Sequence, residues 1–183
     1  MRKLTARSPF LFCLFLGALS LTAQEQSYSR EALESPELYT RLYNTGCKML
    51  GTNLMQHKGI ISTANWVDFS GYEHWTCTIE TGTGRYVVIT DGRGFISEVS
   101  WGVNTNKNNA DTDKIKDALY RGILVRGKED TSASSWYRKA YYMPSVPIEG
   151  EIMNFTAPVM LYVNFSNNNL GFTIISERRG YGR

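Results

Sequence analysis

The sequence predicts an α+β domain, in which six or seven mostly antiparallel strands form a sheet and two helices pack on one of its faces. Three observations support this fold class. Residues 72–101 hold three strand-like runs separated by glycine-containing turns, which is the pattern of a central antiparallel meander. Residues 35–51 and 111–120 carry apolar side chains at helical spacing. Further strand-like runs follow toward the C-terminus.

The first 23 residues have the features of a signal peptide. Three basic residues precede an apolar run over residues 9–21, and small residues follow at Thr22 and Ala23. The apolar run is shorter than the ~20 residues that a bilayer-spanning helix needs. We therefore expect cleavage after Ala23, a secreted or periplasmic location, and no transmembrane span in the remaining chain.

Removing this segment changes the charge balance. It holds three of the 20 Lys and Arg residues and none of the 17 Asp and Glu residues, so residues 24–183 carry 17 of each and no net charge. These 160 residues (183 − 23) suit one α+β domain, with a frayed tail at residues 177–183. A neutral domain has no overall field to attract phosphates, so we expect no nucleic-acid partner.

The order of the elements follows from start and stop signals. Ser35, Pro36 and Glu37 are typical of a helix start, and Gly51 of its end. Asp111 or Thr112 begins the second helix. A strand is expected around residues 65–70, before the meander. The last strands are expected at residues 149–155, 159–165 and 170–176, and residues 24–30 are expected to be a loose tail.

Cys47 and Cys77 are the two cysteines left after signal cleavage. An even pair in an exported chain predicts a disulfide. It would close a loop of 31 residues (77 − 47 + 1) and stabilise the fold by roughly 3.5–4 kcal/mol. A reactive thiol is the alternative, but it needs a neighbouring base or cation.

The candidates for catalysis are weak. His74, Glu80 and Glu98 lie on or beside the meander and could serve acid/base chemistry, although such carboxylates are usually solvated strand residues. A His74–Cys77 dyad is disfavoured because residues three apart on a strand point to opposite faces. The two histidines of the chain lack ligand spacing, so we expect no metal and no cofactor.

An aromatic segment offers a candidate binding surface, in which four aromatic residues are interleaved with two cations. Its candidate binding residues are Trp136, Tyr137, Arg138, Tyr141 and Tyr142. Such residues dominate recognition hot spots and can stack on sugar rings. The same pattern also fits a strand that buries its aromatic side chains on one face, so both interpretations stay open.

Together these features favour a small exported binding protein over an enzyme. Its partner would be a protein or a glycan in the extracytoplasmic space, recognised through an aromatic-rich surface, as an inhibitor or immunity-type protein would do. The alternative is a small secreted hydrolase of envelope polymers that uses carboxylate acid/base chemistry. A third possibility is a structural subunit that pairs through an edge strand of the C-terminal hairpin.

Overall fold

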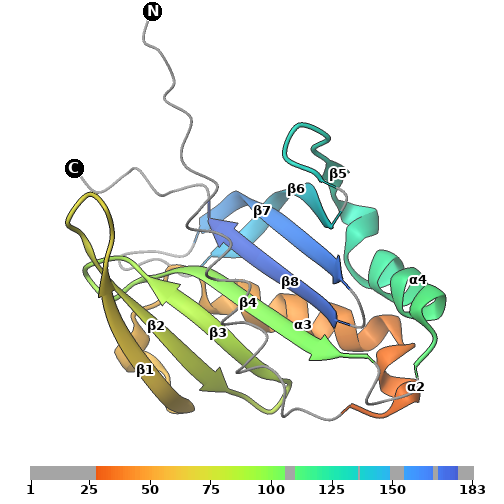
Figure 1. The fold of residues 1–183 in the computed structure, drawn as a ribbon, viewed down its shortest axis with the longest axis horizontal. Helices are drawn as coiled ribbons and strands as arrows, with labels where there is room; N and C mark the ends of the chain where they lie inside the picture. Colours follow the sequence, from red (N-terminus) through yellow and green to blue (C-terminus); the bar gives the residue numbers. More distant parts are fainter. Residues whose placement is uncertain (1–27, 106–109, 136, 149–154, 167–168, 177–183) are drawn as a thin grey trace, which may run out of the picture.

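A computed structural model describes residues 28–105, 110–135, 137–148, 155–166 and 169–176. It confirms the α+β class, with three helices and an eight-stranded antiparallel sheet in the described part of the chain (Figure 1). The predicted signal peptide and the predicted frayed tail lie outside the described residues. No helix of the described ranges is long and apolar enough to cross a membrane.

The chain forms two antiparallel meanders that join in one sheet. The helices are α2 (Arg30–Leu33), α3 (Pro36–Met49) and α4 (Thr112–Gly122). The strands are β1 (Ile60–Val67), β2 (Glu73–Glu80), β3 (Arg85–Thr90), β4 (Ile96–Asn104), β5 (Lys128–Glu129), β6 (Arg138–Ile148), β7 (Phe155–Ser166) and β8 (Asn169–Ser176). Their order in the sheet is β1-β2-β3-β4-β8-β7-β6-β5, so the pairing of β4 with β8 connects the meanders.

The expected number of six or seven strands is wrong, because the sheet has eight. The strand β6 runs through Pro144 and Pro147 and ends at Ile148, before the strand expected at residues 149–155, of which the structure describes only Phe155. A register shift between Met143 and Val146 accommodates the proline-containing stretch, as bulges do where proline cannot join the ladder. The strand expected at residues 65–70 begins earlier, at Ile60, and ends at Val67.

Both predicted helices are present and begin where expected. Ser35 occupies the N-cap of α3 and Pro36 its first turn, although the Ser35 hydroxyl bonds the Glu37 carboxylate instead of a backbone N–H. Asp111 caps α4, since its Oδ1 accepts hydrogen bonds from the backbone N–H groups of Asp113 and Lys114 at 3.0 and 3.4 Å.

The core lies between one face of the sheet and the helices α3 and α4 (Figure 1). Trp101 of β4 is its largest fully buried side chain. The Trp101 ring meets those of Tyr28, Tyr39 and Phe172 at centroid distances of 5.8, 6.2 and 5.5 Å. Aromatic side chains of α3, β4 and β8 therefore share one cluster with Tyr28, which precedes α2.

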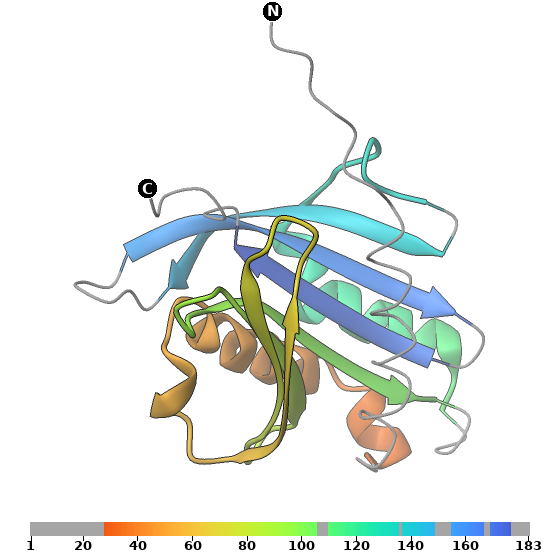
Figure 2. The same cartoon turned by 60° about the vertical axis from the view of Figure 1, so that its left-hand side comes forward.

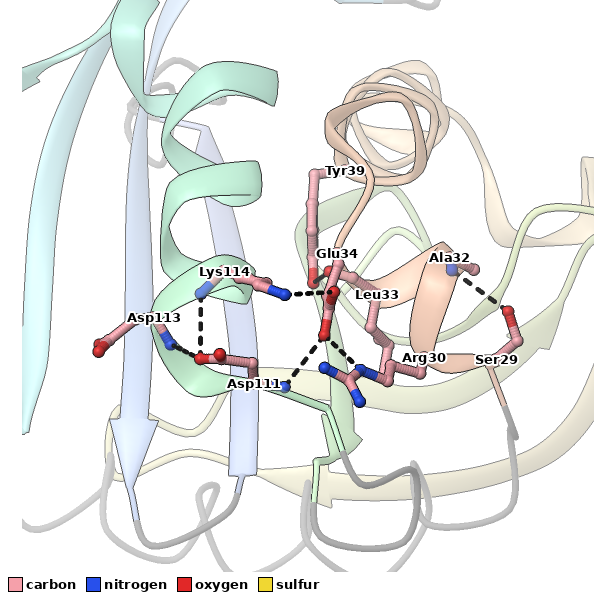
Figure 3. Close-up of polar contacts among 9 residues, drawn as sticks. All are labelled: Ser29, Arg30, Ala32, Leu33, Glu34, Tyr39, Asp111, Asp113 and Lys114. Atoms are coloured by element: carbon pink, nitrogen blue, oxygen red, sulfur yellow. Dashed lines mark hydrogen bonds and ion pairs between the residues drawn. The ribbon is translucent and has the colours of Figure 1, made fainter.

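The short helix α2 was not expected, because residues 24–30 had suggested only a loose tail. Glu34, which follows α2, fastens it to α4 (Figure 3): its Oε1 accepts from Arg30 Nε at 2.7 Å and from the Asp111 backbone N–H at 3.2 Å. Lys114 Nζ lies 3.7 Å from Glu34 Oε2. These groups satisfy one another, so the cluster stabilises the fold.

Candidate functional site

Exposed apolar side chains gather on the hairpin formed by β1 and β2. Nine large hydrophobic residues of the described chain are exposed, and five of them belong to this hairpin: Ile61, Val67, Phe69, Tyr72 and Trp75. Phe69 is 93 % exposed and Tyr72 66 % exposed. We call residues 66–75 the hairpin tip. In Figures 1 and 2 the turn of this hairpin stands clear of both long helices. A group of exposed apolar side chains is more informative than a single exposed leucine, so this hairpin is the candidate site.

The turn of the hairpin tip is held by Asp68. Its Oδ1 accepts hydrogen bonds from the backbone N–H groups of Ser70 and Tyr72 at 2.8 and 3.0 Å. Two backbone bonds close the same turn, from Asp68 N–H to Tyr72 O and from Gly71 N–H to Asp68 O. Gly71 has φ of 83°, which residues with a Cβ rarely adopt. Phe69 is thus carried on a turn with a fixed backbone.

A second layer of contacts lies under this turn. Asp68 Oδ2 is 3.2 Å from His74 Nε2, and the backbone oxygen of Thr90 is 2.9 Å from His74 Nδ1. The Trp66 ring stacks on the imidazole at 4.6 Å between centroids, and the Trp66 Nε1–H donates to Thr76 Oγ1. Aromatic and polar contacts together hold His74 in one orientation.

Asp68 is an anion at neutral pH. The Tyr72 backbone N–H, followed by the His74 ring, holds the pKa of its carboxyl below the usual value. Both ring nitrogens of His74 face oxygen atoms, Nδ1 the Thr90 backbone oxygen and Nε2 the Asp68 carboxylate. The side chains of Asp68 and His74 are therefore engaged with each other and with the backbone of the hairpin tip and of β3.

The exposed side chains of the tip come from both faces of the hairpin. Trp66 pairs with His74 on one face, whereas Val67 and Trp75 lie on the other, because successive residues of a strand alternate. Trp75 shares its face with the buried Cys77 but is itself 37 % exposed. The hairpin thus presents apolar area on both sides and at its end.

The candidate surface at residues 136–142 is divided between the two faces of β6. Tyr141 packs against the core, Tyr137 and Arg138 are half-buried, and Tyr142 is 40 % exposed. The Arg138 guanidinium lies over the Tyr162 ring, 4.7 Å from its centroid. Trp136 lies outside the described residues. Among the residues described, this segment does not form a continuous aromatic patch.

The structure does not bring the catalytic candidates together. His74 and Glu80 share a face of β2 but are six residues apart, or about 20 Å at ~3.3 Å per residue. Glu98 lies two strands away at the level of Thr76, about 10 Å across the sheet. Glu80 instead pairs with Arg85 at 3.2 Å. In the described ranges, no group of three His, Cys, Asp or Glu residues could hold a metal ion.

Cys47 and Cys77 are both free and buried, so the expected disulfide is not formed in the structure. Both belong to the core between α3 and the sheet. Burial raises the pKa of the Cys47 thiol to about 12 and also raises that of Cys77. Thiols held in the protonated form are poor nucleophiles, which argues against catalysis by either cysteine.

The hairpin tip was missed in the sequence because its signals point in different directions. Alternation along the strand places Trp75 on the same face as Cys77, which suggests burial, and the strand expected at residues 65–70 includes Phe69. A useful signal was present in Asp68, Ser70 and Gly71, which are typical turn residues. A phenylalanine in the middle of such a turn lies too far from the core to be buried.

Comparisons of the chain with protein-family models, with curated proteins and with solved structures found no match.

Proposed function

We propose that this chain is an exported binding protein that recognises a partner protein through its hairpin tip. The observation that carries the proposal is the concentration of exposed apolar side chains on one hairpin, with Phe69 at its end. The signal-like N-terminal segment supports an extracytoplasmic location for the partner.

The rigidity of the tip supports a role in recognition. Asp68 and Gly71 set the backbone of the turn before any partner arrives. Because binding is weakened by the entropy lost in ordering loops and side chains, a preformed turn gives more affinity per contact. Phe, Tyr and Trp add large apolar area with few rotatable bonds.

The polar groups of the tip favour a protein partner over a glycan. Sugar recognition needs side chains that hydrogen-bond to hydroxyl groups beside the stacking ring. At this site Asp68 and His74 bond to each other and to the backbone. Ser70 and Glu73 are exposed beside them, but the large exposed side chains of the tip are Val67, Phe69, Tyr72 and Trp75, which fit a hydrophobic pocket on a protein surface.

The test is an affinity capture with the protein purified from the exported fraction after expression of the full-length sequence. The tip variant Phe69→Ser with Tyr72→Ser removes two exposed aromatic side chains. The matched control, Tyr120→Ser with Val125→Ser, removes exposed apolar area near α4. A third variant, Tyr142→Ser, tests the surface expected at residues 136–142.

We expect a stoichiometric partner from the extracellular or periplasmic fraction, with affinity reduced at least ~10-fold in the tip variant and unchanged in the matched control. A partner that the tip variant retains fully would refute the assignment of the site. Retention on envelope polysaccharide, lost in the tip variant, would replace the protein partner with a glycan.

A further inference from the structure

The strand β1 forms one edge of the sheet as far as the structure describes the chain. In the described part of the chain no strand pairs with the outer side of β1, and the opposite edge is the two-residue strand β5. In the antiparallel ladder with β2, every second residue of β1 directs its N–H and C=O groups toward β2. The N–H and C=O groups of the residues between them point outward, away from the sheet. An edge of eight residues offers a template for another strand.

Apart from a register shift at its start, β1 also lacks the features that usually prevent pairing between edges. Its sequence, Ile-Ile-Ser-Thr-Ala-Asn-Trp-Val, contains no charged residue and no proline. Six of its eight residues are exposed. The register shift between Ile60 and Ser62 lies at the start of the strand and leaves residues 62–67 in regular pairing with β2. This regular stretch can accept another strand without like-charge repulsion.

We propose that two copies of this chain pair through their β1 strands, antiparallel and centred on Ala64. If a two-fold axis perpendicular to the sheet relates the two copies, the helix-covered faces of both sheets lie on the same side. Residues that lie opposite one another across the interface then project their side chains to the same face. The centre of the pairing then falls on a single residue.

The side chains favour Ala64 as that centre. Within the regular stretch this register sets polar Thr63 opposite Asn65, and it brings exposed Val67 to exposed Ile61, which lies at the register shift. Ala64 faces its own copy, where a small side chain fits. Centring on Thr63 would set Ile61 opposite Asn65, and centring on Asn65 would set Val67 opposite Thr63, so each alternative pairs an apolar with a polar side chain.

The remaining pair sets Ser62 opposite Trp66. Trp66 leans over its own sheet, where its ring stacks on His74 and its Nε1–H donates to Thr76 Oγ1. The position facing it in the second copy therefore needs only a small side chain, and serine meets that requirement. The dimer would have a continuous sheet of sixteen strands, twice the eight of one copy, with all the helices on the same face.

A charge-swap experiment tests the register as well as the dimer. The full-length sequence is expressed, the exported protein is purified, and its mass is measured by light scattering over a range of concentrations. We expect a dimer for the native chain. Ala64→Lys and Ala64→Glu each place like charges against each other at the axis, and should raise the dimer dissociation constant about tenfold or more. An equimolar mixture of the two variants should restore the dimer.

A cysteine substitution gives a second measurement. In Ala64→Cys the two introduced thiols would lie about 4.5–5.5 Å apart by Cα, within disulfide range, so the variant should cross-link with itself. Val125→Cys, at an exposed position away from β1, should not. A native chain that stays monomeric, or an Ala64→Lys variant that stays dimeric, would overturn the proposal, and an extended segment of another protein would then be the occupant to seek. The proposal does not rest on the proposed function, because every Ala64 variant keeps Phe69, Tyr72 and Trp75.

Discussion

The contact between α3 and α4 leaves no room for a side chain at Gly122, the last residue of α4. A Cβ atom at this position would lie 2.6 Å from the backbone oxygen of Pro36 and 3.1 Å from Tyr39 Cβ. The Pro36 carbonyl belongs to the first turn of α3 and accepts a hydrogen bond from Thr40 Oγ1 at 3.1 Å. Because backbone atoms cannot swing aside as a flexible side chain can, Gly122→Ala must push the helices apart.

The size of the effect follows from two opposing contributions. Restoring an ordinary contact of 3.4 Å needs a shift of about 0.8 Å (3.4 − 2.6), and overpacking of this kind costs ~1–3 kcal/mol. Alanine is favoured over glycine inside a helix by up to ~1 kcal/mol, and by less at a helix end. We therefore expect the free energy of unfolding to fall by about 1–2 kcal/mol.

Urea unfolding followed by far-ultraviolet circular dichroism measures this change. The control is Gly82→Ala, in the turn between β2 and β3, where a Cβ would meet no atom within 4 Å. The control should lie within ~0.5 kcal/mol of the native chain. A Gly122→Ala variant as stable as the native chain would refute the reasoning, because it would show that the two helices can separate at little cost.

Three further predictions follow from buried or bonded groups. Burial raises the pKa of Tyr86 from 10.0, and that of Cys47 from 9.0, each to about 12. The unfolded chain therefore loses these protons first, so the stabilisation contributed by the two protonated groups is complete below pH 9 and is lost as the pH rises toward 12. We expect the free energy of unfolding to fall over this alkaline range, and Tyr86→Phe should reduce the fall measured in urea titrations. Cys47 and Cys77 should not react with a thiol reagent in the native chain, because both thiols are buried. After unfolding without reductant, both thiols should react. If neither thiol reacts after unfolding, the two cysteines are bonded to each other. Asp68→Ala should speed hydrogen exchange at the Ser70 and Tyr72 amides, because it removes the oxygen that accepts their hydrogen bonds. Asp68→Asn keeps the Oδ1 acceptor and should speed the exchange less. Equal exchange rates in the native chain and in both variants would contradict the role of Asp68 in the turn.

The elements that were predicted well are those whose signals are local. The helix start at Ser35 and Pro36, the cap at Asp111 and the meander hairpins depend on neighbouring residues, and each is present in the structure. The strand β6 was not expected as a continuous strand because two prolines interrupt it. Its pairing with β7 holds it in place, and that tertiary contact has no local signal.

The candidate site was harder to predict because exposure depends on which element covers a strand. Trp75 and Cys77 lie two residues apart on the same face of β2, yet only Cys77 is buried. Alternation identifies the face but not how far the helices extend across it. The division of Tyr141 and Tyr142 between the two faces of β6 could be expected from alternation, but the packing of Tyr141 against the core required the fold.

The position of α3 under both meanders has a consequence for how the chain reaches its native state. A Cβ at Gly46 would lie 3.0 Å from Ile174 Cδ1 of β8 and 3.4 Å from Val99 Cγ1 of β4, so this helix packs against a strand that follows it by 128 residues (174 − 46). The sheet-facing side of α3 cannot be fully buried until the last strand has been synthesised. A nascent chain of this topology stays incompletely folded until synthesis is nearly finished, a property that suits a chain predicted to cross a membrane through a channel for unfolded polypeptides.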